Sequence, residues 1–100
     1  MNGFFEEVYA LVARIPAGKV AGYGQLAAML GAVGSARQVG WAMRRCPQGL
    51  PAHRVIKSDG SLAQSDFYEP QKAMLLAEGV TFLPSGKVDM AACRWTGEED

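Results

Sequence analysis

The charged residues are segregated along the chain in a pattern that suits the binding of phosphate groups. No acidic residue occurs between Glu7 and Asp59, whereas this interval holds seven basic residues. They are Arg14, Lys19, Arg37, Arg44, Arg45, Arg54 and Lys57. The net charge of the whole chain is zero, but a local basic face attracts polyanions even on a neutral protein. Charge alone leaves an ordinary solvated surface equally open.

The cysteine and histidine content argues against a metal site and against a disulfide framework. Cys46 and Cys93 are the only cysteines, without metal-ligand spacing, and His53 is the only histidine. We therefore expect no metal and no cofactor. The first seven residues carry two acids and no basic segment followed by an apolar stretch. We expect no signal peptide, no membrane partner and a reducing, cytoplasmic location.

The elements that must position these residues are short helices. A length of 100 residues, with 49% hydrophobic and 20% charged residues, indicates one domain over residues 1–100. Hydrophobic spacing predicts helices over 4–14, over 25–30 with Gly31 as its end, and over 35–45 with Ser35 as N-cap. Two short helices joined by a Gly-containing turn, the second rich in arginine, favour a helix-turn-helix.

The C-terminal half is expected to add a small β element. Residues 54–56 predict a short strand, 58–60 a turn and 61–70 a loop. Pro70 begins a predicted helix that ends at Gly79, and residues 80–83 and 87–90 predict a hairpin around the turn 84–86. The expected fold class is mainly α with a small β element, in a winged helix-turn-helix arrangement.

Four stretches of the sequence, in order, resemble one known family. They are IPAGKV at 15–20 with Tyr23–Gly24, ARQVG at 36–40, PAHRVI at 51–56 and LLAEG at 75–79. Together they are similar to the DNA-binding, active-site domain of the O6-alkylguanine-DNA alkyltransferases, over about residues 4–82. The resemblance implies the winged helix-turn-helix of the C-terminal domain of those proteins.

One position departs from the transferase pattern and changes the expected chemistry. The transferases have a cysteine at the second position of the Pro-x-His-Arg-Val motif, and its thiolate takes the alkyl group. Here that position is Ala52, whose methyl group has no lone pair, so we expect no catalytic residue. The loss is typical of the alkyltransferase-like proteins. Most of them carry Trp at this position, so Ala52 predicts a roomier pocket.

The resemblance also assigns roles to individual residues. Tyr23 matches the tyrosine that pushes on a phosphate to rotate the target nucleotide, and Arg37 matches the arginine that fills the vacated space. The predicted DNA-binding residues are Tyr23, Arg37, Gln38, Val39, Gly40 and Arg44. The predicted lesion pocket comprises Tyr23, Pro51, Ala52, Gln64 and Ser65.

Other residues of the family pattern are expected to be structural. His53 and Glu78 match the partners that activate the transferase thiol, and here we expect them to hold the loop after Pro51 by hydrogen bonds. Arg54 is expected to bridge backbone carbonyls. Trp41 could stack on DNA, but packing in the core or against the surface is favoured. Cys46 stands at the hinge asparagine of the transferases, and residues 63–67 replace their closing Gly-Tyr-x-Gly-Gly segment, so residues 61–69 are expected to line the pocket.

The implied function is that of a non-catalytic sensor of DNA damage. It binds O6-alkylguanine in duplex DNA by nucleotide flipping and promotes nucleotide excision repair. Its expected partners are such DNA and nucleotide excision repair proteins, and we expect a monomer that associates with the nucleoid when bound to DNA.

Two alternatives stay open. One is an active transferase that uses Cys46 or Cys93, which is disfavoured because neither lies in the Pro-x-His-Arg frame. The other is a winged-helix transcription regulator. Its recognition helix should carry side chains that read base edges, whereas Val39, Gly40 and Ala42 suggest a small, smooth face.

Overall fold

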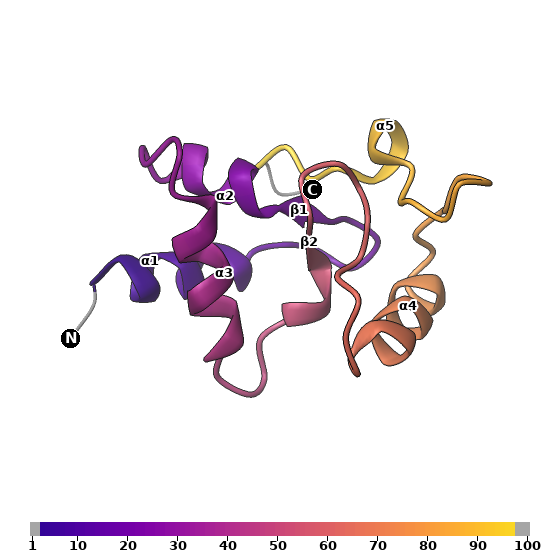
Figure 1. The fold of residues 1–100 in the computed structure, drawn as a ribbon, viewed down its shortest axis with the longest axis horizontal. Coiled ribbons are helices and arrows are strands. Elements are labelled where there is room, and N and C mark those ends of the chain that lie inside the picture. Colours follow the sequence, from indigo (N-terminus) through magenta and orange to yellow (C-terminus); the bar gives the residue numbers. More distant parts are fainter. Residues whose placement is uncertain (1–2, 98–100) are drawn as a thin grey trace.

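Three helices form the N-terminal part of the chain. The computed structural model describes residues 3–97, and in it α1 (Gly3–Val12), α2 (Tyr23–Met29) and α3 (Ala36–Arg44) pack against one another. α2 packs chiefly against α3, with a short turn between them (Figure 1). This is the helix-turn-helix that the sequence predicted. The fold class, mainly helical with a small β element, is confirmed.

The turn between α2 and α3 follows from its glycine and serine. Gly31 adopts a φ of 75°, in the left-handed region that favours glycine, and it ends α2. Ser35 is the N-cap of α3. Its backbone carbonyl accepts hydrogen bonds from the N–H groups of Gln38 and Val39, at 3.0 and 3.2 Å. The side chain of Ser35 makes no capping hydrogen bond, so the cap depends on the backbone alone.

A short parallel sheet joins the helix-turn-helix to the rest of the chain. β1 (Ala21–Gly22) pairs with β2 (Val55–Ile56), with Ala21 opposite Val55. The 3₁₀ turn η1 (Ala52–Arg54) leads into β2. The sequence predicted the second strand but not its partner. Two residues are too few to show an alternating pattern, and both strands are buried on both faces.

The C-terminal part contains α4 (Tyr68–Ala77) and α5 (Met90–Cys93). α4 begins two residues before the predicted Pro70, which sits in the first turn, where its missing N–H is not needed. The predicted hairpin is wrong in extent, because only one antiparallel bridge forms, between Phe82 and Val88. Two backbone hydrogen bonds flank this bridge, from the N–H of Leu83 to the carbonyl of Lys87 at 2.7 Å and from the N–H of Asp89 to the carbonyl of Thr81 at 2.9 Å. The N–H of Val88 points to the other side and donates to the carbonyl of Gly60 at 2.8 Å.

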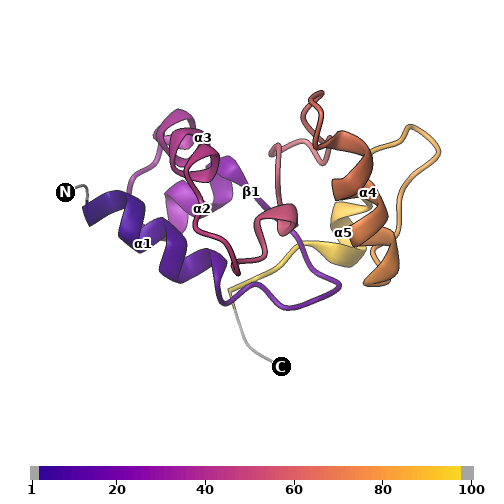
Figure 2. The same cartoon turned by 90° about the horizontal axis from the view of Figure 1, so that it is seen from below.

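Two hydrophobic clusters form the core. The first lies among α1, α2 and α3, and Trp95, 2% exposed, joins it from the C-terminal segment. The second lies under α4, around Ile56, Leu62 and Leu75. Figure 2 shows the corresponding division, with α1 to α3 on one side of the sheet and α4 and α5 on the other. Within residues 3–97, no helix is long and apolar enough to cross a membrane.

Candidate nucleic-acid interface

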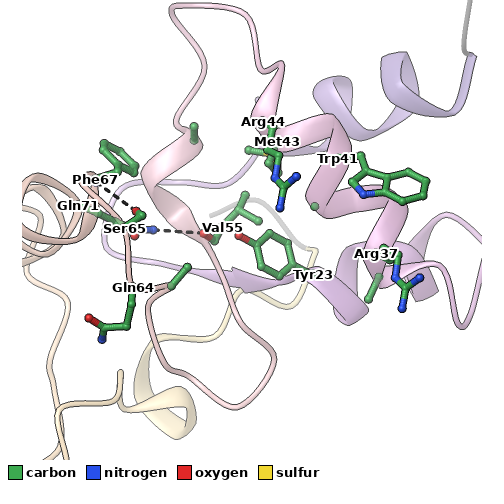
Figure 3. Close-up of a pocket in the computed structure, with 14 residues that line it drawn as sticks. Tyr23, Arg37, Trp41, Met43, Arg44, Val55, Gln64, Ser65, Phe67 and Gln71 are labelled. Atoms are coloured by element: carbon green, nitrogen blue, oxygen red, sulfur yellow. Dashed lines mark hydrogen bonds between the residues drawn. The ribbon is translucent and has the colours of Figure 1, made fainter.

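A cavity of about 710 Å³ opens between α3 and the loop that precedes α4 (Figure 3). Its volume is within the range of ligand sites, roughly 300–1,000 Å³. One wall comes from α2 and α3, and it is formed by Tyr23, Ala36, Arg37, Gly40, Trp41, Met43 and Arg44. The opposite wall comes from η1, β2, the loop and α4, and it is formed by Ala52, Val55, Ala63, Gln64, Ser65, Phe67 and Gln71.

Tyr23 reaches the cavity because it is the first residue of α2, directly after β1. Gly22 allows this placement, since a Cβ there would lie 2.9 Å from the Cα of Ser58. The N–H of Gly24 donates to Ser58 Oγ at 3.1 Å, which fixes the start of the helix. Burial raises the pKa of the Tyr23 phenol, and the nearby Arg44 guanidinium partly offsets that effect. The hydroxyl therefore stays protonated at neutral pH and can donate a hydrogen bond to a phosphate or a base.

The outer face of α3 is basic and exposed. Arg37 and Arg44 both line the cavity, and neither forms an ion pair with any residue from 3 to 97. The inner face carries Val39 and Ala42, each 0% exposed. Val39 was predicted as a DNA-binding residue, but its side chain is buried and is not exposed to a ligand. The expected smooth face of Val39 and Ala42 is wrong for the same reason, because both side chains belong to the core.

Two further predicted DNA-binding residues differ in their placement. Gly40 is half-buried and lines the cavity, with nothing within 4 Å of the position a Cβ would take. Gln38 is exposed on α3 but does not line the cavity. A core position for Trp41 is excluded, since its side chain is 47% exposed and forms part of the cavity wall, whereas packing against the surface stays a prediction.

The opposite wall brings together most of the predicted lesion pocket. Ala52 lies in η1, and Gln64 and Ser65 come from the loop that replaces the closing segment of the transferases. The side chain of Ser65 accepts a hydrogen bond from the N–H of Phe67 at 3.1 Å, which shapes this loop. Pro51 is not among the lining residues, because the chain turns into η1 directly after it and presents Ala52 instead.

Gln71 lines the cavity without having been predicted. It is 6% exposed, and its Nε2 donates to the carbonyls of His53 at 3.1 Å and Val55 at 3.3 Å. Figure 3 shows the second of these bonds reaching across to β2. A polar residue four positions before the buried Leu75, on the inner face of a predicted helix, was the available indication in the sequence.

Glu78 forms hydrogen bonds with both remaining polar residues of the family pattern, His53 and Arg54. His53 Nε2 lies 2.9 Å from Glu78 Oε2, and Arg54 donates to both carboxylate oxygens at 3.0 and 2.7 Å. Hydrogen bonding from Arg54 lowers the pKa of Glu78 to about 2, against the opposing effect of burial. Arg54 also donates to the carbonyl of Ile15 at 2.8 Å. It bridges one backbone carbonyl and a carboxylate, rather than several carbonyls as expected.

Neither cysteine lines the cavity. Cys46 is half-buried after α3, and burial raises the pKa of its thiol. Cys93 is buried in the second hydrophobic cluster, with its Sγ 3.5 Å from Thr81 Oγ1. Among residues 3–97, no group of three or more His, Cys, Asp or Glu side chains is placed to hold a metal ion. The chemistry that this arrangement supports is recognition by shape, charge and hydrogen bonding.

Sequence comparison relates the chain to proteins that act on DNA. The family described as the DNA-binding domain of 6-O-methylguanine DNA methyltransferase matches residues 3–80. The DNA base-flipping protein of Escherichia coli K12 is 42% identical over 98 residues, which cover 94% of this chain and 75% of that protein. Alkyltransferase-like protein 1 of Schizosaccharomyces pombe is 38% identical, over 95% of this chain and 96% of that protein.

Solved structures show the same fold. The crystal structure of S. pombe ATL in complex with DNA superposes with a TM-score of 0.82 at 34% identity, covering 96% of this chain and 97% of that one. S. pombe Atl1 in complex with damaged DNA containing O6-carboxymethylguanine gives a TM-score of 0.80 at 36% identity, over the same shares of the two chains. By sequence and by fold, the chain belongs to the family of the 6-O-methylguanine DNA methyltransferase DNA-binding domain, as one of its alkyltransferase-like members.

Proposed function

We propose that this protein senses alkylated guanine in duplex DNA by extruding the damaged nucleotide into the cavity beside Ala52, without transferring its alkyl group. The observation that carries the proposal is the composition of the cavity wall. A methyl group stands at the position that matches the transferase nucleophile, next to an open volume and opposite Arg37 and Arg44, which form no ion pair within residues 3–97. Relatives named for base flipping, and structures of relatives bound to DNA, support the same reading.

The placement of the cysteines argues against alkyl transfer. A thiol must be deprotonated and within reach of the alkyl carbon to act as a nucleophile. Cys46 and Cys93 do not line the cavity, and burial disfavours the thiolate of Cys46. The alternative of an active transferase therefore has no candidate nucleophile in the cavity.

The energetics of extrusion suit the α3 face. Taking a base out of the duplex costs a few kcal/mol, and the cost is smallest for a damaged base that pairs poorly. In this proposal Arg37 enters the vacated space, and Tyr23, in the same wall of the cavity, supplies a protonated hydroxyl. The other basic residues on this surface add attraction to phosphates that does not depend on sequence. The preference for alkylated DNA then has two sources. Extruding a poorly paired base costs less free energy than extruding normal guanine, and the space beside Ala52 accommodates the alkyl group.

A sensor that leaves the alkyl group in place needs a second protein to remove the damage. We therefore propose that the bound monomer recruits nucleotide excision repair proteins, which excise an oligonucleotide whatever the chemistry of the lesion. In this proposal DNA covers the side of the molecule that carries the cavity, which leaves the rest of the surface for such a partner.

Affinity for three duplexes of one sequence tests the proposal. The target position carries guanine, O6-methylguanine or a bulkier O6-alkylguanine. We expect tighter binding to both alkylated duplexes, and an unchanged protein mass after incubation with either. Equal affinity for all three would favour the transcription-regulator alternative, and a protein heavier by one alkyl group would show that the chain is a transferase.

A further inference from the structure

The outer face of α3 is a ridge with an aromatic side chain at its centre. Arg37, Trp41 and Arg44 are spaced four and three residues apart, which places them on one side of a helix. All three line the cavity, and Figure 3 shows them on the wall opposite Phe67 and Gln71. The ridge therefore borders the cavity that is proposed to take the extruded nucleotide.

Packing within the protein does not account for Trp41. Its side chain is 47% exposed, and within the described part of the chain it belongs to neither hydrophobic cluster. Trp95 provides the contrast, since it is 2% exposed in the first cluster and carries the Arg14 guanidinium 5.6 Å from its ring centre. A half-exposed indole contributes less to the free energy of folding than a buried one, because much of its apolar surface stays in water.

The surroundings of Trp41 favour DNA as the group that covers it. Arginines flank the ring along the helix, so a negatively charged partner is drawn to this surface. Aromatic rings among basic residues are typical stacking platforms for nucleobases, whose faces accept an indole whatever their sequence. The ridge is also continuous with the cavity that is proposed to take the extruded nucleotide.

We infer that Trp41 stacks on a base next to the position vacated by the extruded nucleotide. The inference depends on the proposed function, because a base face is exposed in a duplex only after its neighbour has left the stack. Arg37, one turn away, fills the vacated position, and Trp41 covers the adjoining base. Trp41 is thereby a specificity-determining residue, since its contact forms with extruded DNA and not with an intact stack.

Three variants test the inference by affinity for the O6-methylguanine duplex and its unmodified counterpart. Trp41→Ala should lose roughly tenfold in affinity for the alkylated duplex, as expected for one lost stacking contact, and much less for the unmodified one. Trp41→Phe should keep most of the affinity, because a phenyl ring also stacks. Met74→Ala is the matched control, since Met74 is 46% exposed on α4 and does not line the cavity. It should change neither affinity.

Tryptophan fluorescence gives an independent readout. The chain has two tryptophans, and the buried Trp95 does not line the cavity. Binding of the alkylated duplex should quench the emission of the wild type and leave that of Trp41→Phe nearly unchanged. Thermal unfolding of each variant should match the wild type, because the replaced side chain lies at the surface.

The outcomes separate this inference from the proposed function. A wild type that binds both duplexes equally would overturn both. A wild type that prefers the alkylated duplex, with Trp41→Ala unaffected or weakened equally on both duplexes, would overturn the inference alone. Quenching that persists in Trp41→Phe would overturn it as well.

Discussion

Two sets of arginines in this molecule have opposite surroundings. Arg54 lies between η1 and α4, where its guanidinium donates to both oxygens of Glu78 and to the carbonyl of Ile15. Its side chain is 17% exposed. Arg37 and Arg44 lie exposed on α3 at the rim of the cavity, and neither has an ion pair within residues 3–97. The same residue type is thus held by hydrogen bonds within the fold in one region and, among the described residues, has no ion-pair partner in the other.

The difference shows how to assign a role to a basic residue. A bidentate pair with a carboxylate fixes a guanidinium in place, and breaking it leaves a charge without its partner in a poorly solvated site. A guanidinium without such a partner keeps its hydrogen-bond donors for a ligand. The first set should therefore control stability with little effect on DNA recognition, and the second set should do the reverse.

The largest expected effect is on stability and comes from Arg54. Arg54→Ala leaves Glu78 without its main partner, so we expect a loss of about 3 kcal/mol in the free energy of unfolding. Urea denaturation followed by circular dichroism measures it. Arg45→Ala is the matched control, because Arg45 is exposed at the end of α3 and should change stability by less than about 0.5 kcal/mol. Similar losses for both variants would show that the pair with Glu78 gives Arg54 no larger role in stability than an exposed arginine has.

A smaller stability effect should appear in the pH dependence. Hydrogen bonding from Arg54 and His53 lowers the pKa of Glu78 from its usual 4.5 to about 2. A depressed carboxyl pKa stabilises the fold above the unfolded-state value, and the contribution is lost as the pH falls through the folded-state value. We expect the wild type to lose stability between about pH 4.5 and 2. Glu78→Gln should start from a lower stability and fall less over this interval.

Asp59 is the comparison for that experiment. Hydrogen bonds from Ser61 lower the pKa of Asp59 to about 2 as well, although this carboxylate is exposed. Asp59→Asn should therefore flatten the pH profile less than Glu78→Gln does, because solvent screens an exposed charge. A flatter profile for Asp59→Asn would place the main acid-sensitive contact in this loop instead of at the Glu78 cluster.

The second set should act on recognition. Arg37→Ala should lose roughly tenfold in affinity for the O6-methylguanine duplex and only a few-fold for the unmodified duplex, because the vacated space exists only after extrusion. Filter binding or anisotropy at one salt concentration measures both affinities. Tyr23→Ala should likewise lose more affinity for the alkylated duplex than for the unmodified one.

The smallest expected effect comes from a basic residue on the same helix but outside the cavity. Arg45→Ala should weaken binding to both duplexes about equally and reduce the salt dependence, since a phosphate contact carries no information about the base. Arg44 is less suitable for this comparison because it lines the cavity next to Tyr23. If Arg37→Ala and Arg45→Ala lose the same affinity on both duplexes, Arg37 contacts only a phosphate and does not fill the vacated space.

The sequence predicted the helices well, but it did not predict which strands pair with each other. Helical spacing and the Gly31 turn located α1 to α3, because these features act within a few residues. The pairing of β1 with β2 joins residues more than thirty positions apart through only two residues a strand, so no local pattern marks it. The hairpin forms only one bridge within the described residues, between Phe82 and Val88, and its short extent is likewise not marked by a local pattern.

The candidate site shows the same limit. Family motifs identified Tyr23, Arg37 and Ala52, all of which lie in the walls of one cavity. Helix spacing put Val39 and Ala42 on one face of α3, whereas the family resemblance assigned Val39 to DNA binding. Which face of α3 is buried depends on its packing against α2, and spacing within one helix does not reveal that packing. Gln71 was not predicted, because its side chain bonds to two backbone carbonyls, of His53 and Val55, in a segment far away in the sequence.

The most direct test of the account is a cross-link between the lesion and the wall of the cavity. Ala52→Cys is incubated with a duplex whose target guanine carries an O6-alkyl group ending in an activated disulfide. We predict a protein–DNA disulfide with this variant and none with the wild type, whose Cys46 and Cys93 do not line the cavity. No cross-link to Ala52→Cys, or an equal yield with the wild type, would contradict extrusion of the damaged nucleotide into this cavity.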